Sequence, residues 1–381
     1  MYPLVFSRTK SDIDDSKYDD YGHTVHLKYN KRKDSFFNRL NETSSYKLIK
    51  PLKQYFLKGV PQDLFMRFKK KSFNIDVLTI GANQIHIIDK ENRKIAHFLI
   101  PDANSDWFFN DIETQKIIKN YTIKIPALIN INESVPYFIT DYIEGESFSE
   151  LSFRTFNEIN IELFQFYSEQ RTLIKKNIKS EFELKINLLF KNIDKYDTKG
   201  AASFKKSLLI LIDKINIEDI CLRNNYIFYL NIVHGDMNYR ENIVKSSDKS
   251  LYFIDWEMSR SANLLYDYFY MLMHDVSNNE SINNSLLLRS INNSSQNLFL
   301  SDLINKSFDI NFNVDQLRDY FSLSLLDMML YKILIIEEKR ISKLFLGEID
   351  QRFNSLNILT IKLKRIMEMW DYEKLNKKNI L

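Results

Sequence analysis

The chain has 381 residues, of which 44% are hydrophobic and 27% charged, and its formal net charge is +3. This composition is ordinary for a globular protein of one bilobal unit or two domains, and the small charge excludes a strong nucleic-acid-binding field. One cysteine excludes an internal disulfide and fits a reducing cytoplasm, where we expect the protein to lie. With seven glycines and no His/Cys pattern of zinc spacing, the sequence argues against P-loop, dinucleotide-binding and zinc classes.

No membrane segment is expected. The first residues lack the basic and apolar regions of a signal peptide. The longest apolar stretch, residues 323–336, contains Asp327 and Lys332, so it predicts a buried helix. The basic runs at residues 31–33 and 69–71 are expected to be solvated faces, with peripheral contact to an anionic glycan or a membrane surface as the alternative.

Residues 1–71 are polar with scattered aromatics and are expected to be an N-terminal extension without an assigned role. After them, alternating apolar residues predict three antiparallel strands, at residues 75–80, 84–88 and 94–100. The turn between the first two strands contains Gly81. Residues 107–119 carry an apolar stripe at helical spacing, which predicts a helix.

A second hairpin and a helical region come next. The hairpin is expected from residues 125–131 and 137–141, and residues 142–148 connect it to the helical region. Residues 149–230 are expected to be helical, because apolar residues recur there at core spacing.

The most informative segment is Val233 to Asn242, which contains His-Gly-Asp and ends in Glu-Asn. Two short strands around a turn at residues 246–249 come after it, and the second strand ends in Asp255. Because a hairpin returns its second strand beside its first, we expect Asp255 next to Asn242.

Phosphoryl transfer from a nucleotide needs one carboxylate facing the attacking hydroxyl and two oxygen ligands that hold magnesium. Asp236 fits the first requirement, and Asn242 and Asp255 fit the second. Each piece alone is common in ordinary loops, but the ordered set is rare. The segment therefore predicts a phosphotransfer site that uses ATP and Mg²⁺.

This segment resembles the aminoglycoside phosphotransferase and choline kinase group of the protein-kinase-like superfamily, whose pattern is His-Gly-Asp, a short gap, Asn, and Ile-Asp-Trp-Glu. The resemblance implies that His234 orders the loop, Asp236 is the catalytic base, and Asn242 and Asp255 bind metal. The family usually has its Asn one place earlier, where this chain has Glu241. We interpret this as a one-residue insertion, with Glu241 as a substitute magnesium ligand as the alternative.

The same resemblance implies which residues bind the nucleotide phosphates. His97 falls in the position of the family's phosphate-binding Lys, with Lys94 or another base as the alternative. Because a histidine is mostly uncharged near neutral pH, a weaker grip on the nucleotide is expected. Glu113, or else Asp111, would pair with this base. Gly81 would lie in the turn over the phosphates, unless that turn is an ordinary hairpin.

In the hinge that the resemblance implies, the backbone of Asp141 and Ile143 would contact the adenine edge, and Gly145 would lead into the helical lobe. Asp267 matches a family Asp near the start of the next helix, and we expect it to cap the helix or brace the loop. Residues 266–372 carry mostly helical patterns and are expected to form the acceptor-binding wall.

These elements in this order predict an α+β fold, namely a bilobal protein-kinase-like fold with an antiparallel-sheet N-lobe and a mostly helical C-lobe. The expected parts are an extension at residues 1–71, the N-lobe at 72–141, the C-lobe with the catalytic loop at 142–373 and a polar tail at 374–381.

The resemblance implies a kinase that moves the γ-phosphate of ATP to an alcohol group of a small molecule. The expected acceptor is a sugar or a surface-glycan intermediate of lipopolysaccharide or capsule type. A pseudokinase or nucleotide-binding scaffold with little turnover is the first alternative, favoured by His97 and the lengthened loop. A kinase of aminoglycosides or amino alcohols, or a protein kinase, comes third, and Asp255-Trp256-Glu257 in place of Asp-Phe-Gly argues against a protein kinase.

Overall fold

The structure is a computed structural model that describes residues 4–5, 27–29, 77–80, 84–99, 105–132, 136–170, 173–215, 217–223, 227–279, 282–309, 312–314, 316–341 and 349–378. The described residues fall into two compact units. The first, which we call the sheet unit, includes those up to Lys116 together with Pro126–Glu144 and Glu338–Leu346. The second, the helical unit, includes those of Ile117–Ile125, Gly145–Glu337 and Gly347–Leu381.

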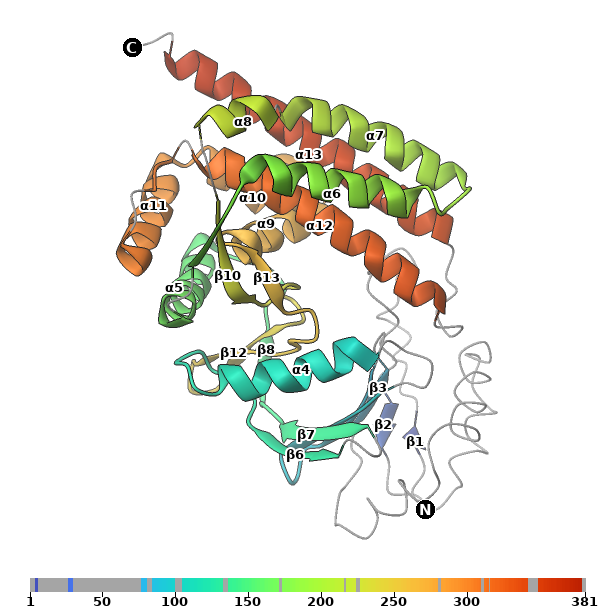
Figure 1. The fold of residues 1–381 in the computed structure, drawn as a ribbon. Coiled ribbons are helices and arrows are strands. Elements are labelled where there is room, and N and C mark those ends of the chain that lie inside the picture. Colours follow the sequence, from blue (N-terminus) through green and yellow to red (C-terminus); the bar gives the residue numbers. More distant parts are fainter. Residues whose placement is uncertain are drawn as a thin grey trace. The chain divides into compact units, whose positions relative to one another are not determined.

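The sheet unit is built on one antiparallel sheet of seven strands in the order β1-β2-β3-β4-β5-β7-β6 (Figure 1). The strands are β1 (Leu4–Val5), β2 (Leu27–Tyr29), β3 (Val77–Ile80), β4 (Gln84–Asp89), β5 (Lys94–Leu99), β6 (Leu128–Asn132) and β7 (Tyr137–Asp141). The predicted strands of this region are confirmed. Two further strands, β1 and β2, come from the predicted N-terminal extension and pair next to β3.

Helix α4 (Ser105–Ile118) accompanies this sheet in the same unit. Its residues Phe108 and Ile112, one helical turn apart, are buried together with Phe138 of β7. The Phe108 ring lies 5.2 Å from the Phe138 ring. The helix predicted at residues 107–119 is thus confirmed, and its apolar face buries against the sheet as its spacing requires.

Two small antiparallel sheets belong to the helical unit, in the orders β13-β10-β9 and β12-β11-β8. Their strands are β8 (Gly145–Ser147), β9 (Leu173–Lys176), β10 (Ile227–Val233), β11 (Ile243–Ser246), β12 (Leu251–Phe253) and β13 (Arg260–Asn263). The expectation of helix throughout residues 149–230 is therefore wrong at β9 and at the start of β10. These two strands pair with each other across about fifty intervening residues, and a pairing partner that distant leaves no local periodic signal.

The helices of this unit are α5 (Phe153–Gln170), α6 (Ile178–Ile193), α7 (Lys199–Ile215), α8 (Ile217–Arg223), α9 (Tyr266–Asn278), η1 (Ile282–Asn284), α10 (Leu286–Ile291), α11 (Ser294–Phe308), α12 (Gln316–Ile341) and α13 (Ile349–Lys378). Figure 1 shows α13 running along α7, and Phe321 of α12 contacts Trp370 of α13 at a ring distance of 5.7 Å. The apolar stretch at residues 323–336 lies inside α12 and is largely buried, as predicted. Among the described residues, no helix is both long enough and apolar enough to cross a membrane.

Candidate functional site

The predicted catalytic loop leaves β10 through Gly235, whose φ angle is +89°. A side chain there would place its Cβ atom 2.0 Å from the carbonyl oxygen of Met258. Only glycine combines this left-handed backbone with so close an approach. The His-Gly-Asp sequence therefore has a steric reason for its middle residue.

His234 is fully buried and joins the loop to the strand end that precedes Asp255. Its Nε2 atom lies 2.8 Å from the carbonyl oxygen of Ile254 and must donate to it, because a carbonyl only accepts. Its Nδ1 atom then accepts from the Asp236 amide at 3.4 Å. Burial lowers the pKa of His234, against the opposing charge of Asp267. The neutral ring thus links the loop to the strand end at Ile254, and its role in ordering a catalytic loop stays a prediction.

Asp267, in the first turn of α9, braces the loop. Its carboxylate accepts hydrogen bonds from the amides of His234 at 2.8 Å and Gly235 at 3.0 Å, and from the hydroxyl of Tyr167 in α5. The loop-bracing role expected for Asp267 is the one that the structure has. Tyr167 was not foreseen, because it precedes Asp267 by 100 residues and belongs to no motif.

Asn242 is 4% exposed and held to the loop by its amide group. Its Nδ2 atom donates to the carbonyl oxygen of Asp236 at 2.6 Å. Because that carbonyl can only accept, Nδ2 must face it, and the Oδ1 atom points the other way. The backbone carbonyl of Asn242 also accepts from the Ile254 amide at 3.0 Å, next to Asp255.

Glu241, the alternative metal ligand, has a different environment. Its side chain is exposed and accepts a hydrogen bond from Asn238 Nδ2 at 2.9 Å. Asn242 thus takes the buried, loop-anchored position, whereas Glu241 lies on the outer side. The geometry favours the interpretation of a one-residue insertion before Asn242.

Asp255 ends the hairpin in a left-handed backbone conformation with a φ angle of +64°. This conformation costs a non-glycine residue about 1 kcal/mol, and Asp tolerates it better than most. Its neighbour Trp256 is fully buried and donates from Nε1 to the Phe253 carbonyl at 3.1 Å. The Trp256 ring also lies 4.6 Å from the His234 ring. A packed indole thus holds the chain where Asp255 turns outward.

Asn242 and Asp255 suit a magnesium ion better than a zinc ion. No group of three or more His, Cys, Asp or Glu side chains with metal-site geometry occurs among the described residues. One amide oxygen and one carboxylate match magnesium, which takes few protein ligands and binds phosphate oxygens and water besides. Zinc sites use three or four nitrogen and sulfur ligands as a rule.

In the sheet unit, His97 lies on β5 with both ring nitrogens close to polar neighbours. Nδ1 is 3.2 Å from Gln84 Oε1, and Nε2 is 3.0 Å from Thr140 Oγ1. The ring stacks on Phe138 at 4.2 Å. Burial, with the nearby ring of His86, lowers the pKa of His97 well below its ordinary value. His97 is therefore a neutral ring within the sheet and supplies no positive charge at neutral pH.

The two carboxylates considered as partners of that base lie on different sides of α4. Glu113 is exposed and forms an ion pair with Lys116 at 2.6 Å. Asp111 is 2% exposed and accepts a hydrogen bond from Gln115 Nε2 at 2.8 Å. Because His97 is neutral, it carries no positive charge with which Glu113 or Asp111 could pair.

The predicted hinge begins at the end of β7. The amide of Asp141 donates to the Ala127 carbonyl at 3.0 Å, and the amide of Tyr142 donates to the Arg93 carbonyl at 2.9 Å. Because the amides of Asp141 and Tyr142 are already bonded, the groups expected to contact adenine are the Asp141 carbonyl and the Ile143 amide. Gly81, also predicted to contact the nucleotide, lies outside the described residues.

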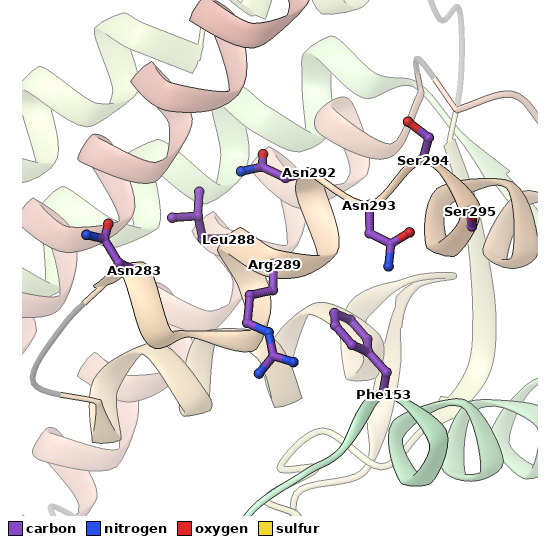
Figure 2. A pocket seen from close by; sticks show the side chains of 8 residues that line it. All are labelled: Phe153, Asn283, Leu288, Arg289, Asn292, Asn293, Ser294 and Ser295. Atoms are coloured by element: carbon purple, nitrogen blue, oxygen red, sulfur yellow. The ribbon is translucent and has the colours of Figure 1, made fainter.

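A surface pocket of about 490 Å³ opens elsewhere in the helical unit (Figure 2). Arg289 of α10 lies over the Phe153 ring at 4.9 Å in this pocket, and the other lining residues are mostly Asn and Ser. None of the predicted site residues lines it.

Comparison with known proteins supports the fold that this geometry indicates. No protein-family model and no curated protein sequence matches the chain. Among solved structures, the ethanolamine kinase of Plasmodium vivax matches at 14% identity with a TM-score of 0.50, over 86% of this chain and 91% of that one. The GDP complex of aminoglycoside 2'-phosphotransferase-IIIa matches at 13% identity with a TM-score of 0.51, over 83% of this chain and all of that one.

The chain has the protein-kinase-like fold. This fold explains why the strand-rich sheet unit precedes the helical unit that carries the His-Gly-Asp loop. The predicted α+β kinase-like fold class is thereby confirmed. At these identities the likeness concerns the fold alone, so the chemistry of the loop rests on its own residues.

Proposed function

We propose that the chain is an ATP-dependent phosphotransferase that moves the γ-phosphate to a hydroxyl group of a small molecule. One observation carries the proposal: Asn242 Nδ2 donates to the Asp236 carbonyl at 2.6 Å. This hydrogen bond joins the candidate base to a candidate metal ligand in one rigid loop. The fold likeness to an ethanolamine kinase and an aminoglycoside phosphotransferase supports it.

In this proposal Asp236 acts at the acceptor hydroxyl. Its carboxylate accepts the hydroxyl proton or orients the oxygen as that oxygen bonds to the γ-phosphorus. The bond between the γ-phosphorus and the bridging oxygen breaks, and ADP leaves with that oxygen. His234 accepts from the Asp236 amide, and Asp267 accepts from the amides of His234 and Gly235, so these two side chains would hold the backbone around Asp236.

The outward Oδ1 of Asn242 and the carboxylate of Asp255 would hold magnesium. When bound there, magnesium supplies positive charge that stabilises the phosphate oxygens. The carbonyl of Asp141 and the amide of Ile143 would contact the adenine. The proposal assigns residues 72–141 to a nucleotide-binding lobe. It assigns residues 142–373 to a second lobe, which carries the catalytic loop.

The test measures ADP formation with a mixture of sugars, aminoglycosides and amino alcohols as acceptors. Asp236→Asn and Asp255→Ala should each lower kcat at least about 100-fold. Asp248→Asn is the matched control, because this carboxylate belongs to the turn of the same hairpin and accepts from Ser250 within that turn. Full activity in both site variants would refute the mechanism.

A nucleotide-binding scaffold with little turnover is the second candidate, and His97 favours it. A neutral ring in place of a lysine offers a phosphate less attraction. ADP formation separates the two candidates. The scaffold would bind magnesium and ATP, which would raise its Tm, but it would form no ADP with any acceptor.

Among acceptors we place a sugar or surface-glycan hydroxyl first, in the cytoplasm where ATP is available. Aminoglycosides and amino alcohols, the substrates that the two similar structures are named for, are the alternatives.

A further inference from the structure

The surface pocket of the helical unit is formed by three helices, and its lining residues include Arg289 of α10, Phe153 at the start of α5 and Asn293, which directly precedes α11 (Figure 2). Its volume of about 490 Å³ lies in the usual range of small-molecule sites, about 300–1,000 Å³. Neither Asp236 nor Asp255 lines it. The pocket is therefore separate from the predicted catalytic loop and large enough for a small organic ligand.

Side-chain hydrogen bonds join the three helices that form the pocket. Gln296 Nε2 in α11 donates to Asn157 Oδ1 in α5 at 2.6 Å. Asn297 Nδ2, also in α11, donates to the carbonyl oxygen of Ile291 in α10 at 3.1 Å. Because the walls are already held together, a ligand would not have to order them on binding.

Arg289 is an exposed residue on an otherwise buried helix. The structure describes all six residues of α10 (Leu286–Ile291), and the five besides Arg289 are buried. The N-cap residue Ser285 is buried as well, and its hydroxyl accepts from the Leu288 amide. The helix is thus fixed in the protein and presents one cation to the pocket.

The guanidinium group of Arg289 lies over the Phe153 ring, with its carbon atom 4.9 Å from the ring centroid. Figure 2 shows the two side chains extending toward each other from α10 and α5. Contact through the face of a guanidinium leaves the N–H groups at its edge available. Within the described part of the chain, no carboxylate forms an ion pair with Arg289 and no acceptor bonds to its guanidinium. This edge can therefore bind a ligand.

Asn293 supplies a second donor to the pocket. Its Oδ1 atom accepts from the Gln296 amide at 3.1 Å. Because this oxygen is the acceptor, the NH₂ group of the side chain points away from that amide. Figure 2 shows the Asn293 side chain extending to the side on which Arg289 and Phe153 lie. The amide oxygen is thus used within the protein, and the NH₂ group is left to donate to a ligand.

The charge of the lining residues decides which ligands fit. Arg289 is positive, and the described residues that line the pocket include no Asp and no Glu. The exposed hydroxyl groups of Ser294 and Ser295 can donate as well. Phosphate and carboxylate groups match this set, because they are negative and accept several N–H and O–H donors at once. A cationic ligand would meet a like charge without a compensating carboxylate.

We propose that this pocket is a second ligand site of the chain, and that Arg289 and Asn293 bind a small organic anion there through its phosphate or carboxylate group. The inference goes beyond the proposed function and does not rest on it, because binding at Arg289 needs neither ATP nor turnover. Phosphate and carboxylate share the chemistry that the pocket recognises, so the probes of the experiment have to separate them.

The experiment measures the Kd of three probes for the full chain by isothermal titration calorimetry, at constant ionic strength and without ATP. The probes are glucose 6-phosphate, glucuronate and glucose, which share one ring and carry a phosphate, a carboxylate or a hydroxyl group at the same carbon. We expect at least one charged probe to bind at least about tenfold more tightly than glucose. The tighter of the two charged probes identifies the preferred group. Binding of neither, or equal binding of glucose, would overturn the inference.

Arg289→Gln removes the positive charge and keeps a polar side chain at an exposed position. The Kd of the tighter charged probe should rise at least about tenfold. Arg154→Gln is the matched control, because Arg154 follows Phe153 on α5, is exposed and pairs with Glu158 at 3.0 Å. It removes the same charge near the pocket, and its Kd should stay within about twofold of the wild type. A Kd for Arg289→Gln equal to that of the control would contradict the site.

Asn293→Asp tests the second donor without removing the cap of α11. Aspartate caps a helix about as well as asparagine, so the Tm should not fall. The NH₂ group becomes a negative oxygen, and the charged probe should bind at least about tenfold more weakly. Asp236→Asn in the catalytic loop should leave the Kd unchanged. Weaker binding to Asp236→Asn, with wild-type binding to Arg289→Gln and Asn293→Asp, would place the probe at the catalytic loop and refute the second site.

Discussion

The Nε2 atom of His234 lies 2.8 Å from the carbonyl oxygen of Ile254, twenty residues further along the chain. His234 stands two residues before Asp236, and Ile254 stands one residue before Asp255. One hydrogen bond from a neutral imidazole therefore sets how the catalytic loop and the end of the hairpin lie relative to each other.

Replacing His234 by Phe should weaken this link while keeping an aromatic ring next to Trp256. The Ile254 carbonyl would lose its buried donor, so we expect the free energy of unfolding to fall by about 1–3 kcal/mol. A small displacement of Asp255 should lower kcat at least about tenfold and raise the magnesium concentration needed for half-maximal rate. Steady-state kinetics across a magnesium series measures both effects. His234→Gln, which can donate to a carbonyl, should recover part of the loss, and equal rates in wild type and His234→Phe would contradict the role.

The Asp267 carboxylate accepts from two loop amides and from Tyr167. In Asp267→Asn one acceptor oxygen becomes an NH₂ donor that faces other donors. We expect the free energy of unfolding to fall by about 2–3 kcal/mol, seen as a lower urea midpoint at an unchanged slope. The control is Asp302→Asn, a carboxylate exposed on α11, whose midpoint should match the wild type. A midpoint for Asp267→Asn equal to that of the control would show that the brace adds nothing.

Gly235→Ala tests the steric requirement of the loop. The new Cβ atom would lie 2.0 Å from the Met258 carbonyl, on a residue with a φ angle of +89°. The loop has to shift, so a loss of at least about 2 kcal/mol in unfolding free energy is expected, with loss of activity. Thermal and urea unfolding measure this loss of stability. Ser261→Ala is the control, because Ser261 is exposed on neighbouring β13. A Gly235→Ala protein as stable and active as Ser261→Ala would refute the requirement.

Stability should fall at mildly acidic pH because of buried histidines. Burial, assisted by Arg240, lowers the pKa of His274 from its ordinary 6.5 to about 4. Below pH 6.5 the unfolded chain binds a proton at this residue and the folded chain does not, so the free energy of unfolding decreases as the pH falls. At pH 5 this one residue should lower it by about 2 kcal/mol relative to pH 7. Urea unfolding at pH 7, 6 and 5 measures the slope, which should be shallower in His274→Phe. Equal slopes in both proteins would contradict the shift.

Some of the site could be predicted because its parts are close in sequence. The order of Asp236, Asn242 and Asp255, and the hairpin that joins the last two, are set by turn residues and short apolar strands. Such local signals depend on backbone preferences and on neighbours within a few residues. Strands β3 to β7 and helix α4 were predictable for the same reason, since each carries its own periodic pattern, whereas β1 and β2 were not predicted.

Other features depend on contacts between residues far apart in the chain. His97 occupies a position expected for a lysine, and only its place between Gln84 and Thr140 reveals a neutral, hydrogen-bonded ring. Strand β9 could not be foreseen because its partner β10 lies about fifty residues away.

The sequence by itself determined the order of Asp236, Asn242 and Asp255, which predicts a phosphotransfer site, within a kinase-like succession of strands and helices. The tertiary structure alone decided which groups surround those residues, such as Tyr167 and Asp267, which brace the loop. The physical reason is that chain order and hydrophobic periodicity are local properties. Burial, and the pKa shifts that burial causes, arise only when distant elements pack together.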